Sequence, residues 1–407
     1  MKTTYFHTLA FVPLLFGFYT HTHAGVVTTE GQDIIIKTDG GFSARTADDQ
    51  FSISLTGRIN LDTSYSSGVL NNATDDKSRV DSYLRRGYFG ITGTAFKDWY
   101  YEMIVNGYGD LGSESQLEWD TFFLQYKGLP WFDVMIGRAV RPFGLEQSIS
   151  SGATSTIERA AIWDLTNAGN TESSQQLQLS KGYDKMSWAV SLYDNGNTSV
   201  NSQSTRYGYD GRITYAPILS KKEVLHLGLS LDDANIDQGT FTAKSTLGAK
   251  KSDGIKFATG TFDSDRSGVL EFAYMNGPFS VQSEYLKRKL KAVDDSSEDA
   301  DIQSYYLMGT YTLTGESRGY SAKSGKFSNI TPSHKTGAWE LVGRYEHVDV
   351  DQYDSKKADV YLLGVNWYAN KNVKLMLNLQ NIQTKQVAEA SRDDSGNSAS
   401  MRVQYNF

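Results

Sequence analysis

The sequence predicts an all-β fold, a transmembrane antiparallel β-barrel of 16 strands with one long loop folded inward. Apolar and polar residues alternate with a period of two in many segments, for example 51–65, 337–348 and 371–384. The polar face is charged on nearly every strand, and aromatic residues, 13% of the chain, mark the strand ends. The last segment, 398–407, alternates in the same way and closes on Phe407. A closed sheet leaves no unpaired edge in lipid, so a barrel with an apolar outer face is expected.

Composition excludes several classes of protein. The 407 residues contain no Cys, so disulfides, zinc–cysteine sites, iron–sulfur clusters and thiol nucleophiles are impossible. The net charge of −7 provides no basic surface for nucleic acid. No later stretch approaches the length of an apolar transmembrane helix.

The N-terminus has the features of a secretory signal. Lys2 precedes a short apolar run, 9–18, and small residues at Thr22 and Ala24 suit cleavage after Ala24. A membrane anchor would need about 20 apolar residues, roughly twice this run. We therefore predict a signal peptide over 1–24, a short periplasmic N-terminal segment over 25–50 and a single barrel over 51–407 in a Gram-negative outer membrane.

Sixteen strands follow from the alternation, and an even number places both termini in the periplasm. In chain order they are 51–65, 80–94, 98–109, 115–127, 131–138, 173–181, 186–195, 206–217, 223–235, 268–276, 279–290, 301–314, 337–348, 357–369, 371–384 and 398–407.

The connections divide into two sets. Tight turns such as 95–98 and 128–130 fall on the periplasmic side, and long loops such as 139–172 and 236–267 fall outside. Segment 254–263 also resembles a strand, but a seventeenth strand would swap the sides of all earlier turns, so we assign it to the loop. Segment 315–336 is long and yet falls on the periplasmic side.

The long loop 139–172 is unusually apolar. It contains Phe143, Leu145, Ile149, Ile157, Ile162 and Trp163. These side chains need a surface to pack against, and the inner barrel wall is the nearest. The alternative is that the loop covers a neighbouring subunit.

Several segments resemble one family of porins. They are 51–62 (FSISLTGRINLD), 137–146 (GRAVRPFGLE), 313–320 (LTGESRGY), 337–345 (GAWELVGRY), 366–370 (NWYAN) and the terminal strand. On these segments the chain resembles the phosphate-selective porins of the O and P type. The resemblance implies a homotrimer of 16-stranded barrels, each with its own pore, in which the loop after PFGLE narrows the channel.

The resemblance also implies the residues of the constriction. Arg159 matches an Arg of the family's central site, Ser150 and Ser151 match a pair of Ser, Asp120 matches an Asp, and Tyr88 matches a pore-facing Tyr. Arginine suits this purpose, since its planar guanidinium donates two parallel hydrogen bonds to phosphate. Where the family has a Lys just after PFGLE, this chain has Gln147.

Strand alternation adds further cations. The pair Arg85 and Arg86 matches the family's arginine ladder, and the period of two places Arg86 inward with Tyr88. Arg85 should then point outward unless a bulge intervenes. Arg58 faces inward by the same period, as do Arg212, Arg288, Arg344, Lys374 and Arg402. Each of these could instead pair with a carboxylate of the lumen, as crossed charges do in large porins.

We therefore predict an outer-membrane channel for passive diffusion of anions, phosphate or polyphosphate, through an Arg-lined constriction. The alternative is a general, weakly selective small-solute porin on the same scaffold, favoured by Gln147 and by an acidic run over 294–301. The expected partners are small anions, outer-membrane lipid and lipopolysaccharide, and two further copies of the chain. We expect no enzymatic activity, cofactor or metal, because the mature chain keeps only three His and no nucleotide-binding or metal-binding spacing.

Overall fold

The computed structural model describes residues 24–28, 32–38, 40–71, 78–110, 116–167, 173–194, 205–236, 240–295, 298–387 and 394–407. The predicted signal peptide, apart from Ala24, lies outside these residues, as does the end of the long loop at 168–172. Within the described ranges, no helix has the length and apolar character needed to cross a membrane.

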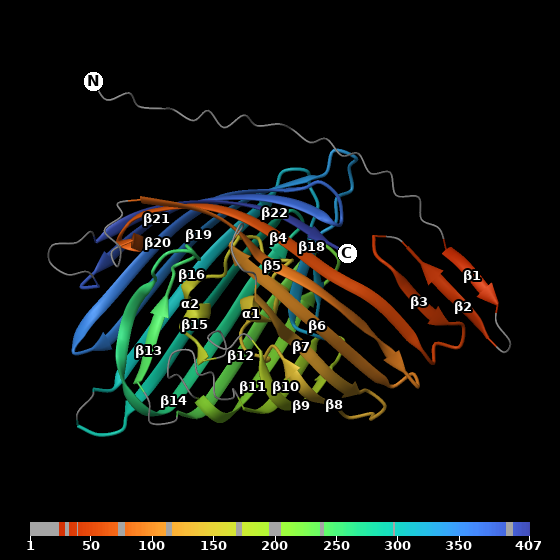
Figure 1. Cartoon of the computed structure of the whole chain (residues 1–407), viewed down its shortest axis with the longest axis horizontal. Coiled ribbons are helices and arrows are strands. Elements are labelled where there is room, and N and C mark those ends of the chain that lie inside the picture. The colour runs from red at the N-terminus through yellow and green to blue at the C-terminus, as the bar shows by residue number, and fades with distance from the viewer. Residues whose placement is uncertain are drawn as a thin grey trace.

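Sixteen antiparallel strands close into a barrel, as the sequence predicts (Figure 1). Each strand pairs with its neighbours in chain order, and the last strand pairs with the first through Arg402↔Asp62 and Gln404↔Asn60. The strands are β4 (Ser52–Gly68), β5 (Ser78–Ala95), β6 (Trp99–Asp110), β7 (Gln116–Tyr126), β8 (Asp133–Ala139), β9 (Ser174–Gly182), β10 (Met186–Asp194), β11 (Thr205–Leu219), β12 (Glu223–Ile236), β14 (Ile255–Asn276), β15 (Phe279–Ala292), β16 (Ala300–Thr312), β19 (Ala338–Gln352), β20 (Asp354–Tyr368), β21 (Val373–Lys385) and β22 (Ser395–Asn406).

The burial of side chains follows the predicted alternation. On β4, Ile59 and Leu61 are exposed on the outer face, whereas Asn60 and Asp62 are buried in the lumen. In a soluble β-sandwich the apolar face is buried and the polar face is exposed. Here the apolar face points outward, which is the arrangement that a lipid environment requires.

The assignment of 254–263 to a loop is wrong. Residues 255–263 form the first part of β14, which runs without a break from Ile255 to Asn276. Residues 255–261 pair with β13 (Thr240–Ser245), and the pairing with the barrel strand β15 begins at Phe262. The strand count of 16 is unaffected, because the segment lengthens a barrel strand and adds none.

A small sheet precedes the barrel. Strands β1 (Ala24–Thr28), β2 (Asp33–Lys37) and β3 (Ser43–Thr46) form an antiparallel meander, and β3 pairs with the start of β4. The meander lies beyond the end of the barrel at which the C-terminus is found (Figure 1). Its periplasmic location stays a prediction.

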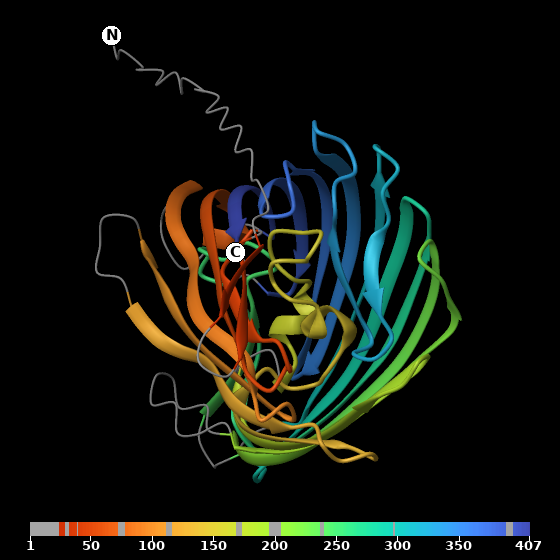
Figure 2. The same ribbon diagram turned by 90° about the vertical axis from the view of Figure 1, so that its right-hand side faces the viewer.

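The long loop packs inside its own barrel, which answers the question of what its apolar residues contact. It carries the short helices α1 (Leu145–Ser148) and α2 (Ala161–Asp164), which lie within the ring of strands (Figure 2). Its backbone bonds to the inner wall: Ile157 N donates to Asn378 Oδ1 at 2.7 Å, and Leu145 N donates to Glu284 Oε1 at 2.6 Å. Both bonds are buried, so the loop is built into the lumen.

A second segment enters the lumen from the opposite end. The long connection 315–336 forms a hairpin of β17 (Arg318–Ser321) and β18 (Lys326–Ile330). Arg212 of the wall donates to the carbonyl oxygens of Ser324 (3.3 Å) and Gly325 (2.8 Å). Phe327 of the hairpin packs with Leu145 and Ile149 of the inward loop.

One side of the lumen is filled with apolar side chains. Inward residues of β15, β16 and β19, such as Leu286, Ile302 and Val350, pack with Phe143 and Leu165 of the inward loop. Residues of β13 and of the first part of β14 join this cluster. The lumen of a porin is generally polar, but these wall residues are apolar because two loops cover them and exclude water.

Candidate pore constriction

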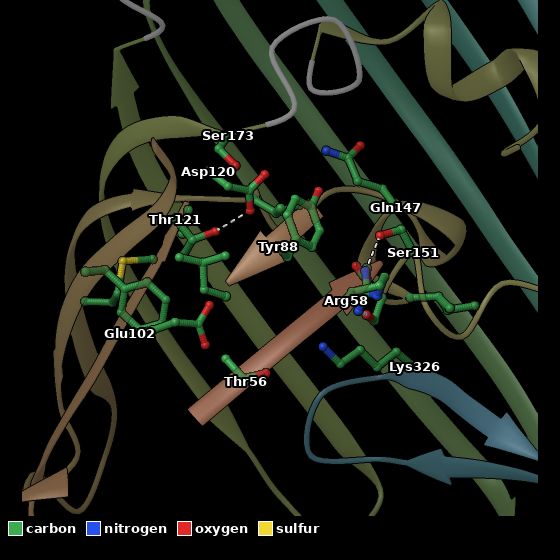
Figure 3. A pocket seen from close by; sticks show the side chains of 18 of the residues that line it. Thr56, Arg58, Tyr88, Glu102, Asp120, Thr121, Gln147, Ser151, Ser173 and Lys326 are labelled. Carbon is green, nitrogen blue, oxygen red and sulfur yellow. Dashed lines mark hydrogen bonds between the residues drawn. The ribbon is translucent and has the colours of Figure 1, made fainter. Parts of the chain in front are cut away.

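A cavity of about 550 Å³ lies between the inward loop, the hairpin β17–β18 and the wall formed by β4 to β9. All seven residues that the sequence singled out line this one cavity: Arg58, Arg86, Tyr88, Asp120, Ser150, Ser151 and Arg159. They come from β4, β5, β7 and the inward loop, and Figure 3 shows several of them around the open space.

Arg58 joins the wall to the inward loop. Its guanidinium donates to Ser151 Oγ at 2.5 Å, to Ser150 Oγ at 2.9 Å and to Asn406 Oδ1 at 3.0 Å. The loop approaches so closely that a Cβ on Gly152 would lie 2.7 Å from Arg58 Nε. Each Ser hydroxyl accepts from Arg58 and therefore keeps its own O–H hydrogen for another group. Arg58 makes no salt bridge with a carboxylate within the described residues.

Arg86 and Arg85 both face the lumen, so the outward position expected for Arg85 by simple alternation is wrong. A β-bulge leaves Arg85 out of the pairing, because β4 pairs Asn60 with Arg86 and Leu61 with Leu84. Arg85 forms a bidentate pair with Glu158 of the inward loop, at 2.8 and 3.1 Å. Arg86 is 4% exposed, and its Nε has no hydrogen-bond partner.

Arg159 binds the backbone of the inward loop and an aromatic ring. Its Nε donates to the carbonyl oxygen of Glu146 at 3.0 Å, and its Nη2 donates to that of Ile149 at 2.7 Å. Its guanidinium also lies over the ring of Trp163, 4.6 Å from the centroid. Arg159 therefore holds two parts of the inward loop together while it contributes a positive charge to the cavity wall.

Acidic and aromatic groups line the side opposite the loop. Asp120 accepts a hydrogen bond from Thr121 at 2.9 Å (Figure 3), and Glu102 accepts one from Tyr100 at 3.0 Å. Tyr88 lies beside Arg58, whose guanidinium carbon is 5.4 Å from the ring centroid. The cavity thus combines cations, hydroxyl donors and two carboxylates.

Sequence reasoning missed one cation of this cavity, Lys326. It reaches the cavity from the hairpin β17–β18, drawn in blue in Figure 3. Lys326 also lines a second cavity of about 420 Å³, together with Lys127, Lys181 and Lys323. One signal could have revealed Lys326: the connection 315–336 is long, whereas the other connections on the same side of the barrel are tight turns.

The other arginines that strand alternation places inward are paired, as the alternative of crossed charges predicts. Arg212 binds Glu271, Arg288 binds Asp265, and Arg344 binds Glu346, each with a closest distance of 2.6 or 2.7 Å. Arg402 binds Asp62 with two bonds of 2.7 Å. With Arg141, which lies between Asp210 and Asp232, we call these five the paired arginines.

The histidines form no catalytic arrangement within the described residues. His226 is buried between Glu271, 3.1 Å from its Nε2, and Tyr320, 2.8 Å from its Nδ1. His347 lies on the outer face, with its Nδ1 2.8 Å from Asp359. In the part of the chain that the structure describes, no group of three or more His, Cys, Asp or Glu could hold a metal ion.

Comparisons with known proteins agree with this architecture. A family model described as phosphate-selective porin O and P matches residues 53–407. Porin O of Pseudomonas aeruginosa is 32% identical over 440 residues, which cover 98% of this chain and 99% of that protein. An uncharacterized protein of Caulobacter vibrioides is 28% identical over 74% of this chain and 67% of its own length.

Several solved porin structures share the fold. An anion-selective porin from Comamonas acidovorans matches with a TM-score of 0.58 and 14% identity, over 88% of this chain and all of that chain. OmpT of Vibrio cholerae, in its trimer form, matches with a TM-score of 0.57 and 12% identity over the same shares of the two chains.

Proposed function

The chain belongs to the phosphate-selective porin O and P family of outer-membrane channels, and we propose that it lets anions, above all phosphate or polyphosphate, diffuse through the cavity described above. One observation carries the proposal. Arg58, Arg86 and Lys326 line the cavity, and within the described residues none of them forms a salt bridge with a carboxylate. Three positive charges that are not held in salt bridges are what a passing anion needs.

The chemistry of the wall suits an oxyanion. An anion in the constriction exchanges water for guanidinium and ammonium N–H groups and for the hydroxyl hydrogens of Ser150 and Ser151. Asp120 and Glu102 oppose the cations from the other side. Their negative charge limits how tightly an anion binds, and passage requires that binding stay weak enough for release.

A broader, weakly selective small-solute channel is the second candidate. It is favoured by Gln147, which is neutral where the family resemblance expects a Lys, and by the acidic residues at the loop around 294–301. Both features lower the attraction for anions, although exposed charges act over only about 8–10 Å at physiological salt.

We also propose that three copies of the chain assemble through the wall at β8 to β10. A strand that crosses the hydrocarbon core needs about 9–11 residues. β8 has 7 residues, fewer than this range, and β9 and β10 have 9 each, the shortest length within it. These short strands offer the least surface to lipid, so we place the contact between copies here; the trimer form of the OmpT structure is an example of such assembly among similar folds.

The test is the reversal potential of the purified protein in a planar bilayer under a KCl gradient, followed by addition of phosphate. We expect reversal on the anion side and a dose-dependent block of chloride current by phosphate. Reversal near zero or on the cation side, with no block, would support the weakly selective channel instead. Chemical cross-linking of the same preparation tests the trimer.

A further inference from the structure

Position 147 leaves a gap in the positive charge of the constriction. Gln147 lines the cavity from the start of the inward loop and is 5% exposed. Neither its amide nitrogen nor its amide oxygen has a hydrogen-bond partner. A glutamine side chain carries no charge. Because its amide has no hydrogen-bond partner, no cationic side chain is bound to it among the described residues.

Lys326 brings a charge to the same cavity from the other end of the barrel. Its side chain reaches into the cavity near Arg58 (Figure 3). Within the described residues its ammonium forms no hydrogen bond and no salt bridge. Because Lys326 lines both cavities, it lies where the two meet. An anion that moves from one cavity to the other therefore comes close to this ammonium.

The hairpin holds Lys326 in this place. Successive strand residues face opposite sides, and Phe327 packs against Leu145 and Ile149, so Lys326 faces away from that contact and into the cavity. Arg212 binds the carbonyl oxygens of the hairpin turn, and Tyr320 is hydrogen-bonded to His226. The turn itself fits closely, since Gly325 has φ of +55° and a Cβ there would lie 2.4 Å from Thr214 Oγ1.

We propose that Lys326 is a specificity-determining residue of this channel and supplies the positive charge that Gln147 does not. The constriction then draws its cations from both ends of the barrel: Arg58 and Arg86 from the wall and Lys326 from the periplasmic hairpin. The inference rests on the proposed function for the nature of the permeating ion. An ion responds to the field at its position, and the field does not depend on which segment carries the charge.

The experiment moves the charge between the two positions. Reversal potential in a KCl gradient and the half-blocking concentration of phosphate are measured for the wild type, Lys326→Gln, Gln147→Lys and the double variant Gln147→Lys/Lys326→Gln. We expect Lys326→Gln to shift reversal toward cations and to raise the half-blocking concentration about tenfold, the order of one charge-assisted hydrogen bond. The double variant should return most of the way to the wild type.

Matched controls separate charge from folding. Lys335→Gln removes the same charge from an exposed position of the same connection and should leave both readouts unchanged. Lys326→Arg keeps the charge and should keep the selectivity. Heat-modifiable migration on gels verifies that every variant is folded.

Two results would overturn the proposal. One is a Lys326→Gln channel with the selectivity of the wild type, and the other is a double variant no better than Lys326→Gln. A wild type without anion preference or phosphate block would instead overturn the proposed function. The shift caused by Lys326→Gln would still show whether Lys326 sets the charge of the pore.

Discussion

Two groups of inward arginines use the same residue type in opposite ways. The paired arginines are nearly fully buried, and each binds at least one carboxylate. Arg58 and Arg86 line the cavity of about 550 Å³ and make no such pair within the described residues. Arginines of both kinds face inward by the same strand alternation.

This difference separates the cations that stabilise the fold from those that can attract an ion in the cavity. A buried ion pair offsets the cost of removing two charges from water, and little of its field remains for a third ion. A cation without a carboxylate keeps its field for whatever enters the cavity. The paired arginines therefore hold the inward loop and the wall together, whereas Arg58, Arg86 and Lys326 form the candidate selectivity site.

The largest expected effect comes from breaking a pair. Arg402→Ala leaves Asp62 without its two hydrogen bonds and removes the donors to Ile157 O and Glu158. We expect a loss of about 3–5 kcal/mol in the free energy of unfolding, as for other buried pairs broken on one side. Urea unfolding in lipid vesicles, followed by tryptophan fluorescence, measures it.

The double variant Asp62→Asn/Arg402→Met is the control for this prediction. It removes both charges and should recover part of the loss. If Arg402→Ala were no less stable than Arg58→Ala, the distinction between the paired arginines and the arginines of the cavity would be wrong.

Removal of an unpaired cation should act on selectivity and spare stability. For Arg58→Ala and Arg86→Ala we expect the half-blocking phosphate concentration to rise roughly tenfold, since each removes a charged donor. The free energy of unfolding should fall by only about 1 kcal/mol, because no carboxylate is left alone. Single-channel recordings and urea unfolding give the two numbers.

Arg266→Ala is the matched control. It removes the same charge from the outer surface, where Arg266 binds Asp233 and its side chain is 73% exposed. An equal change of phosphate block in Arg266→Ala would mean that net charge, and not the cavity, sets the selectivity.

Arg159 lies between the two classes, and its variants sharpen the comparison. We expect Arg159→Ala to lower the anion preference more than Arg344→Ala does, because Arg159 lines the cavity and Arg344 is paired. Arg159→Lys keeps a charge but loses the two bonds to the loop backbone. It should restore selectivity and not stability, and reversal potentials beside unfolding curves test both. Restoration of stability alone would assign Arg159 to the structural class.

The smallest effect concerns the base of the hairpin. Burial raises the pKa of Glu316, but hydrogen bonds from Thr314 and Ser333 outweigh it and lower the pKa from 4.5 to about 2. A lowered pKa in the folded state means that this stabilisation is complete above pH 4.5 and is lost as the pH falls from about 4.5 to about 2. The difference in unfolding free energy between wild type and Glu316→Gln should therefore shrink between pH 7 and pH 3. A gap that stays constant over this range would contradict the assignment.

Much of the architecture was predictable because it depends on local pattern. The period of two along β4 and β22 indicates which residues face lipid, and the even strand count follows from the turns. Resemblance in short segments brought Arg159, Ser150 and Asp120 to notice, and the structure places them around one cavity. The bulge at Arg85 was not predictable, because one extra residue in a strand changes the facing of its neighbours without changing the composition.

The sequence by itself determined the barrel and the faces of its strands outside the bulge at Arg85, since alternation is a property of neighbouring residues. Only the tertiary structure decided which cations are paired and which are open to an anion. Arg402 meets Asp62 across 340 positions of the chain, and Lys326 meets Arg58 at a cavity built from opposite ends of the barrel. Electrostatic pairing depends on distance in space, and distance in space between remote segments is set by how the strands close and the loops fold inward.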